Sequence, residues 1–162
     1  MVDKISVMFG LGLLKPAPGT WGSLPGIPLS WGLYYISSAI MGRKEEVLSG
    51  AAALLCAVIL VVLSFAATLC IRATEKRWNC HDDKSIVIDE VLGQMVALSW
   101  FPPSAGISVA AFALFRFFDI VKPGPIGWVD KKVHSAFGTL LDDLLAGLFA
   151  ALSLVFIRNL LS

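Results

Sequence analysis

The longest uncharged run of the sequence, residues 47–71, constrains the fold more than any other feature. It contains 25 consecutive positions without Asp, Glu, Lys or Arg, and most of them are apolar. A helix needs about 20 such residues, at about 1.5 Å of rise each, to cross a hydrocarbon layer about 30 Å thick. We therefore expect this segment to span a membrane with some tilt.

The composition of the whole chain indicates the same environment. Hydrophobic residues make up 57% and charged residues 15% of the 162 positions, against roughly 45–50% and about 25% in soluble domains. The mean hydropathy is +0.79. This apolar content excludes a disordered chain, and a net charge of +1 excludes a basic nucleic-acid-binding protein. We expect an all-α, polytopic helical membrane protein in which residues 1–162 form a single membrane-embedded domain.

About five spans are expected, some of them short or kinked. Pro102 and Pro103 interrupt an uncharged stretch, so that either one kinked span or two spans joined by a tight turn fit there. Two spans give helices of similar length. The segment PAPGTWGSLPGIP, residues 16–28, is rich in Pro and Gly and predicts a loop before a short helix. The predicted spans are 28–41, 47–71, 85–101, 105–120 and 144–157, the last extended upstream by AFGTLL.

The distribution of charge predicts how these spans are oriented. With five spans, ten of the thirteen Lys and Arg residues fall on one side, which the positive-inside rule makes cytoplasmic. A single kinked span over 85–120 would remove this bias, so two spans are favoured. Ten of the twelve acids share the same side, whereas Glu45 and Glu46, beside Arg43 and Lys44, are expected in a solvated loop. The chemistry is therefore predicted at the cytoplasmic face.

Five carboxylates stand near the ends of three predicted spans: Asp89, Glu90, Asp119, Asp142 and Asp143. They would repel one another if they met without a cation. Hard oxygen ligands without His or Cys partners favour Mg²⁺ as that cation. Neighbouring helical residues point about 100° apart, so a single member of each adjacent pair could be the one that faces the site.

Structural roles compete for some acids. Asp82 or Asp83 could cap a helix that begins near Lys84. Asp119 could form ion pairs with bases three residues away on either side, Arg116 and Lys122.

Two further stretches could bind a phosphate. The segment LLKPAPGTWGS, residues 13–23, offers amides, hydroxyls and a charge through Lys15, Gly19, Thr20 and Ser23. The segment RFFDIVKPGPIGWVD, residues 116–130, combines Arg116, Asp119 and Lys122 with a proline-stiffened turn at the membrane interface. His81 and His134 are predicted loop residues outside the site.

Four motifs in this order resemble the phosphatidylglycerophosphatase A family of bacteria over essentially the whole chain. They are APGTWGS, DDKSIVIDEVLG, FRFFDIVKPGPI with the later Asp130, and GTLLDDLLAG. The resemblance implies a Mg²⁺-dependent, multi-pass lipid phosphatase of the inner membrane. Such an enzyme removes the terminal phosphate of phosphatidylglycerophosphate and yields phosphatidylglycerol and inorganic phosphate, a step of phospholipid biosynthesis.

The resemblance points to the motif positions, and the assignment of acids to the metal is our own inference from their chemistry. We predict that the catalytic residues are Asp89, Glu90, Asp119 and Asp143. We predict that the metal ligands come from Asp83, Asp89, Glu90, Asp119, Asp142 and Asp143. We predict that the residues that bind the substrate phosphate are Lys15, Gly19, Thr20, Ser23, Arg116 and Lys122. Either a water molecule or a carboxylate could be the nucleophile.

Other classes of protein fit the sequence less well. A CDP-alcohol phosphatidyltransferase would need a DGxxAR…GxxxDxxxD pattern, which DDLLAG does not supply. A membrane transporter would place an acid near the middle of a span, whereas these acids lie near helix ends. Histidine-nucleophile lipid phosphatases and haloacid-dehalogenase-like enzymes lack their signatures here.

Overall fold

The computed structural model describes residues 2–41, 47–48, 50–81 and 83–161, with Leu161 described by its backbone alone. The expectations for residues 43–46 and for Asp82 concern positions outside the described residues. The helices in chain order are α1 (Val2–Ser6), the 3₁₀ helix η1 (Met8–Leu13), α2 (Pro18–Ser23), α3 (Gly26–Met41), α4 (Gly50–Trp78), α5 (Ile88–Leu98), α6 (Ala105–Val121), α7 (Pro125–Lys132) and α8 (Ala136–Leu161). The described residues contain no β-strand, which confirms the predicted all-α class.

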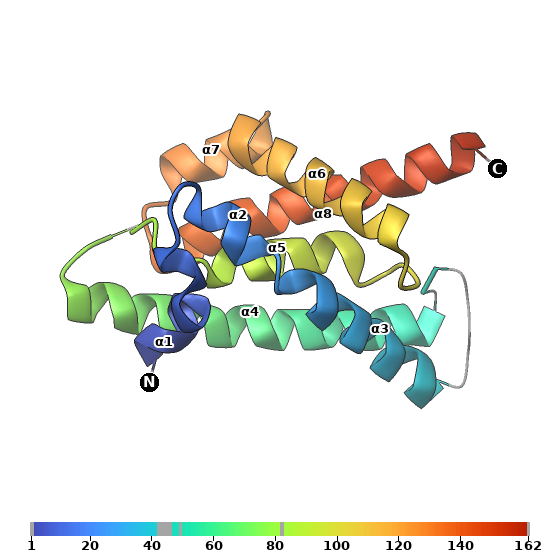
Figure 1. Cartoon of the computed structure of the whole chain (residues 1–162), viewed down its shortest axis with the longest axis horizontal. Coiled ribbons are helices and arrows are strands. Elements are labelled where there is room, and N and C mark those ends of the chain that lie inside the picture. Colours follow the sequence, from blue (N-terminus) through green and yellow to red (C-terminus); the bar gives the residue numbers. More distant parts are fainter. Residues whose placement is uncertain (1, 42–46, 49, 82, 162) are drawn as a thin grey trace.

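Helix α5 lies in the middle of an elongated bundle (Figure 1). Helices α4 and α8 run along the long axis on either side of it, and α3 and α6 pack against it as well. The short helices α1, α2 and α7 gather at one end of the bundle, together with the N-terminus, while the C-terminus lies at the other end. One end of the bundle is therefore built from loops and short helices, and this end carries most of the charged side chains.

Two of the described helices, α4 and α8, are each long and apolar enough to cross a membrane. Large apolar side chains on α4 face outward, among them Val61 and Phe65, which are 68% and 69% exposed. This is the surface expected of a helical membrane protein. Helices α3, α5 and α6 have 16, 11 and 17 residues. The total of about five spans stays a prediction.

The chain breaks between α5 and α6 at the two prolines, as the two-helix reading predicts. Helix α5 is shorter than the predicted range 85–101, because its start is tied to the N-terminal segment and its end closes in a turn. The Val87 N–H donates to the carbonyl of Ser6 (2.9 Å), and the Phe101 N–H donates to the carbonyl of Leu98 (3.1 Å). Residues 85–87 and 99–101 therefore form turns and loops instead of helix.

Two segments predicted as a loop and a turn contain or lead into short helices. Pro18 and Pro125 stand in the first turns of α2 and α7. Proline is well tolerated there, because its missing N–H would have no partner within the helix and its φ is already helical. The predicted loop across residues 16–28 is therefore interrupted by α2, and the predicted turn after Lys122, which the structure has at residues 123–124, leads directly into α7.

Helices α5 and α8 approach each other closely through glycine. A Cβ atom at Gly93 would lie 2.5 Å from the Phe115 ring and 2.7 Å from the carbonyl oxygen of Asp143, and a Cβ atom at Gly147 would collide with the carbonyl of Gly93. Small residues of this kind let membrane helices pack backbone to backbone. This contact fixes the first turn of α5 against the acidic turn of α8.

Candidate active site

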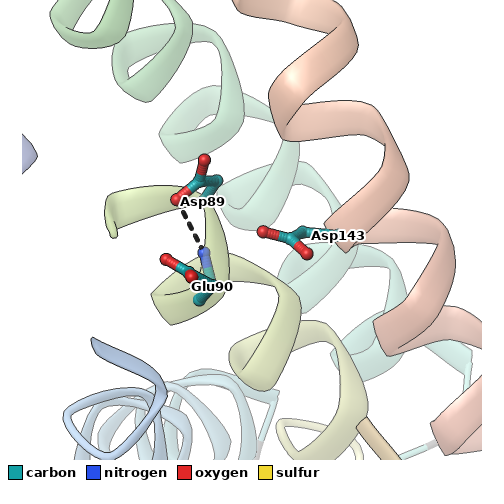
Figure 2. Close-up of side chains that lie close together, drawn as sticks. All are labelled: Asp89, Glu90 and Asp143. Carbon is teal, nitrogen blue, oxygen red and sulfur yellow. Dashed lines mark hydrogen bonds between the residues drawn. The ribbon is translucent and has the colours of Figure 1, made fainter. Parts of the chain in front are cut away.

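Three carboxylates from α5 and α8 meet at the charged end of the bundle (Figure 2). Asp89, Glu90 and Asp143 each offer an oxygen atom, and these atoms lie within 4.8 Å of one another. Asp89 and Asp143 are 4% and 5% exposed. The Glu90 N–H donates to Oδ1 of Asp89 (3.1 Å), and Oε2 of Glu90 is buried without a hydrogen-bond partner. The cluster thus concentrates negative charge away from bulk water.

A cavity of about 420 Å³ opens over this cluster. All six predicted metal ligands line it, so both members of each adjacent acidic pair face the site. The cavity also brings together three of the predicted phosphate-binding residues: Gly19, Arg116 and Lys122. The convergence of acids from three helices is therefore present in the structure.

Arg116 is held in the cavity by an acid on its own helix. Its Nη1 atom lies 2.6 Å from Oδ2 of Asp119, one turn further along α6. The same nitrogen donates to the hydroxyl of Ser23 (3.4 Å), and the Nε atom is buried without a partner. Since a guanidinium group has five N–H donors in a fixed fork, Arg116 keeps donors for an anionic ligand.

Lys122 ends α6 and joins it to α7 and α8. Its Nζ atom donates to Oδ1 of Asp130 and to Oδ2 of Asp142, both at 2.5 Å. Partial burial lowers the pKa of Lys122, but the hydrogen bonds to the two carboxylates outweigh it and raise the pKa above its ordinary value. Lys122 therefore carries a positive charge throughout the physiological pH range.

Helix α2 covers the start of α5, and glycine makes this close contact possible. A Cβ atom at Gly19 would collide with Oε1 of Glu90 and lie 3.1 Å from Nη1 of Arg116. Ser23 is buried, and its hydroxyl donates to the carbonyl of Gly19 (2.6 Å). The backbone of α2 thus forms one wall of the cavity, which gives the motif APGTWGS a structural reason.

Three of the four predicted phosphate-binding residues of the first motif do not line the cavity, and of these Ser23 contacts a lining side chain, Arg116. Lys15 is exposed two residues before Ala17, which does line the cavity. Thr20 is half-buried and is not among the lining residues. The proposed phosphate-binding role of these two side chains therefore receives no direct support from their positions.

Asp83 does not cap a helix. Its Oδ1 atom accepts a hydrogen bond from the Ser85 N–H (2.8 Å), while α5 begins only at Ile88 and has no side-chain cap. The expectation of a helix that begins near Lys84 was wrong, because residues 83–86 form a turn instead. Asp83 lines the cavity from this turn.

Sequence reasoning missed two polar residues of the cavity wall, Lys84 and Thr139. Thr139 precedes Asp143 by four residues, so the helical period places both side chains on one face of α8 and could have indicated it. Lys84 lies inside the motif DDKSIVIDEVLG, directly after Asp83, and its charge was the available signal. His81 and His134 line other cavities, as expected for residues outside the site.

Comparisons with known proteins agree with this geometry. The family model for phosphatidylglycerophosphatase A matches residues 4–158. A phosphatidylglycerophosphatase A of Haemophilus influenzae is 40% identical over 152 residues, which cover 93% of this chain and 85% of the relative. One of Escherichia coli is 35% identical over 156 residues, which cover 96% and 82%.

A third relative carries a different name. The Bacteroides thetaiotaomicron protein named "Putative phosphatidylinositol-3-phosphatase" is 32% identical over 151 residues, which cover 90% of this chain and 86% of the relative. No solved structure matches the chain. The match over nearly the whole length, together with the two relatives above, shows that this chain belongs to the phosphatidylglycerophosphatase A family of phosphatases.

Proposed function

We propose that this protein is a Mg²⁺-dependent phosphatidylglycerophosphatase of the bacterial inner membrane that forms phosphatidylglycerol for phospholipid synthesis. The observation that supports this most strongly is the meeting of six carboxylates with Arg116 and Lys122 around one cavity. Phosphoryl transfer needs cations for the phosphoryl oxygens and carboxylates for a metal ion. The cavity supplies both at the polar end of a membrane bundle.

The acidic cluster fits Mg²⁺ by its chemistry. Asp89, Glu90 and Asp143 offer hard oxygen atoms within 4.8 Å of one another. In the described part of the chain no Lys or Arg forms an ion pair with any of the three. Buried carboxylates that lack a cationic partner repel one another, and the unpartnered Oε2 of Glu90 is left to bind a ligand. These three residues would hold the ion.

The other three predicted ligands have neighbouring roles. Asp119 and Asp142 bind Arg116 and Lys122 and so hold both cations beside the cluster. Asp83 lines the same cavity from the turn before α5.

The protein's own side chains would then prepare the substrate for an in-line attack. Arg116 and Lys122 neutralise the oxygens of the terminal phosphate, and the α2 backbone at Gly19 limits the space around it. When bound, Mg²⁺ supplies Lewis-acid stabilisation of the charge on the transferring phosphoryl group. Water and a cavity carboxylate both remain candidates for the nucleophile. A hydroxylamine-sensitive phosphoenzyme would be trapped with a carboxylate nucleophile and not with water.

The orientation of the active site follows from the charge distribution. Ten Lys and Arg residues lie on α1, on α7, near the C-terminal ends of α4 and α6 and in the adjoining loops, at the end of the bundle that holds the cavity, whereas Arg158 lies near the C-terminal end of α8. The positive-inside rule therefore favours a cytoplasmic active site. Membrane orientation can be measured by cysteine labelling at Lys131 and Arg158 in intact cells and in opened vesicles.

The proposed reaction can be tested with the purified protein in detergent. We expect release of inorganic phosphate from phosphatidylglycerophosphate, loss of the activity with EDTA and its return with added Mg²⁺. A panel that includes phosphatidylinositol-3-phosphate, phosphatidate and lysophosphatidate measures the choice of headgroup. Faster hydrolysis of phosphatidylinositol-3-phosphate than of phosphatidylglycerophosphate would contradict the proposed substrate.

The assignment of the site has its own test. Asp119→Asn should abolish turnover and leave membrane insertion intact, because Arg116 loses the carboxylate that holds it. Asp3→Asn is the matched control, since Asp3 binds Arg77 outside the cavity. Normal turnover of Asp119→Asn would refute the assignment.

A further inference from the structure

A second large cavity lies at the same end of the bundle, between α4 and the start of α8. Its volume is about 430 Å³, similar to that of the catalytic cavity. Its wall includes Arg72 on α4, His81 in the following loop, and His134, Ser135 and Phe137 around the start of α8. None of these residues has a part in the proposed phosphatase reaction. We call this cavity the α4–α8 groove.

The α4–α8 groove lies where the apolar surface of the bundle ends. Arg72 directly follows the uncharged run 47–71, while Thr68, one turn earlier within that run, also lines the groove. Ile71 and Ala136, next to Arg72 and Ser135, are buried in one apolar cluster. The groove therefore crosses the boundary between the apolar and the polar surface, which is the level of phospholipid headgroups.

The groove offers hydrogen-bond donors for an anion. The guanidinium group of Arg72 is exposed and forms no ion pair or hydrogen bond with any residue in the described ranges. The hydroxyl of Ser135 accepts from the Gly138 N–H (3.1 Å) and keeps its own proton to donate. The one acid in the wall, Glu75, binds Nδ1 of His81 (2.6 Å). A guanidinium fork matches the oxygens of a phosphate group.

We infer that the α4–α8 groove binds the phosphodiester of an anionic glycerophospholipid, with Arg72 as its main ligand. Basic pockets at the polar ends of membrane helices bind anionic headgroups. The acyl chains would lie on the apolar surface beside Thr68 and Phe137, and Phe137 is 51% exposed. A lipid is the favoured source of the phosphate, because a free phosphate ion has no apolar part that could contact the apolar surface beside the groove.

A third cavity lies between the groove and the catalytic cavity. This smaller cavity of about 100 Å³ shares His81 and His134 with the groove, and it shares Lys122, Thr139 and Asp142 with the catalytic cavity. A lipid in the groove would thus lie beside the reaction site, within the same leaflet. The inference concerns binding alone and does not depend on which phosphomonoester the enzyme hydrolyses.

The test measures lipid binding and not turnover. The full-length protein is stripped of lipid in a neutral detergent, and phosphatidylglycerol or phosphatidylcholine is titrated while bound lipid is counted by native mass spectrometry. We expect the wild type to retain phosphatidylglycerol in preference to phosphatidylcholine. Arg72→Gln should weaken phosphatidylglycerol binding about tenfold, because it removes the charged fork.

Matched variants separate this site from general charge effects. Arg77→Gln makes the same change on the same helix, at a side chain that binds Asp3 and lies outside the groove, and it should bind phosphatidylglycerol like the wild type. Arg72→Lys keeps the charge without the fork and should give an intermediate loss. If the Arg72→Gln protein is not monodisperse, the comparison of Arg72→Lys with the wild type tests the inference instead.

Three results would each overturn the inference. The first is equal binding of phosphatidylglycerol by the wild type and the Arg72 variants. The second is equal retention of phosphatidylcholine and phosphatidylglycerol by the wild type. The third is displacement of phosphatidylglycerol by inorganic phosphate, which would assign the groove to free phosphate.

Discussion

Helices α4 and α5 follow one another in the sequence and differ in almost every other respect. Six of the 29 residues of α4 are buried, and they form one stripe along it: Ala52, Cys56, Leu60, Ala67, Ile71 and Thr74. Eight of the 11 residues of α5 are buried, including Asp89. Helix α4 presents its other faces to lipid, whereas α5 is surrounded by α2, α3, α4, α6 and α8.

The difference shows that the most apolar helix need not be the one that carries the active site. The charge-free run of α4 makes membrane insertion easy to predict. Helix α5 is too short to cross a bilayer by itself, at about 16 Å, and its acids are tolerated because protein and not lipid surrounds them. Intramembrane acids of this kind face the interior of a bundle and mark functional sites.

Within the comparison of α4 and α5, the largest effect should come from neutralising the acidic cluster beside α5. Asp143→Asn should lower turnover about a thousandfold, the scale seen when a single stabilising group is removed from an active site. It should also raise the thermal stability of the metal-free protein, because one of three clustered negative charges is gone. Turnover and thermal unfolding in EDTA check the two effects.

The same isosteric change outside the cluster provides the control. Asp3→Asn removes a carboxylate that binds Arg77 on α4, and it should leave turnover close to that of the wild type. A loss of turnover as large as that of Asp143→Asn would show that the acid cluster has no special role.

Substitutions of two leucines test whether α5 is more tightly packed against protein than α4. Leu98 on α5 is fully buried, and Leu98→Ala should lower the free energy of unfolding by about 2–5 kcal/mol, because it leaves a cavity. Leu54 on α4 is 67% exposed, and Leu54→Ala should change the free energy of unfolding by less than about 0.5 kcal/mol. Chemical unfolding in detergent measures both. Equal losses would mean that α4 is packed against protein on its outer face.

The next effect concerns the cover over the start of α5. Gly19→Ala should lower turnover about a hundredfold, since a displacement of about 1 Å in a catalytic site has that consequence. The added methyl group would push Glu90 or α2 out of place. A kinetic assay with phosphatidylglycerophosphate checks this. Unchanged turnover would mean that α2 shifts to accommodate the methyl group without moving Glu90.

The smallest effects in this series come from glycines in helices. Gly93→Ala would press a methyl group against Phe115 and Asp143 and should cost about 1–3 kcal/mol of stability. Gly32→Ala on α3 meets open space, and it should stabilise the protein by up to about 1 kcal/mol through helix propensity. Thermal unfolding of the pair checks the opposite signs. A destabilising Gly32→Ala would show that this face of α3 is covered.

The long helices could be predicted because charge and proline mark their ends. Helix α6 covers Ala105–Val121 against a predicted 105–120, and it begins just after the two prolines. Helix α4 continues to Trp78, beyond the predicted end at 71. A helix that leaves the hydrocarbon region can extend into water, so the end of an apolar run does not fix the end of the helix.

The short elements and the pairing of charges could not be predicted in the same way. Prolines suggest a loop unless the residues around them are known to pack as a first helical turn, which is the case in α2 and α7. The sequence places six acids near helix ends, but contacts between helices decide that Asp142 binds Lys122 while Asp143 joins Asp89. Such choices depend on side-chain directions across the bundle.

The position of Asp143 along α8 determines how far a substrate's terminal phosphate must extend to meet the acidic cluster. Seven residues, or about 10 Å of helix, separate it from Ala136, which lines the same groove as Arg72. A phosphate attached directly to diacylglycerol would have to sink by that depth together with its lipid. A phosphate at the end of a flexible glycerol arm can fold back towards the bilayer while its acyl chains stay in place. The depth of the active site would then select substrates by the length of the linker between the terminal phosphate and the diacylglycerol.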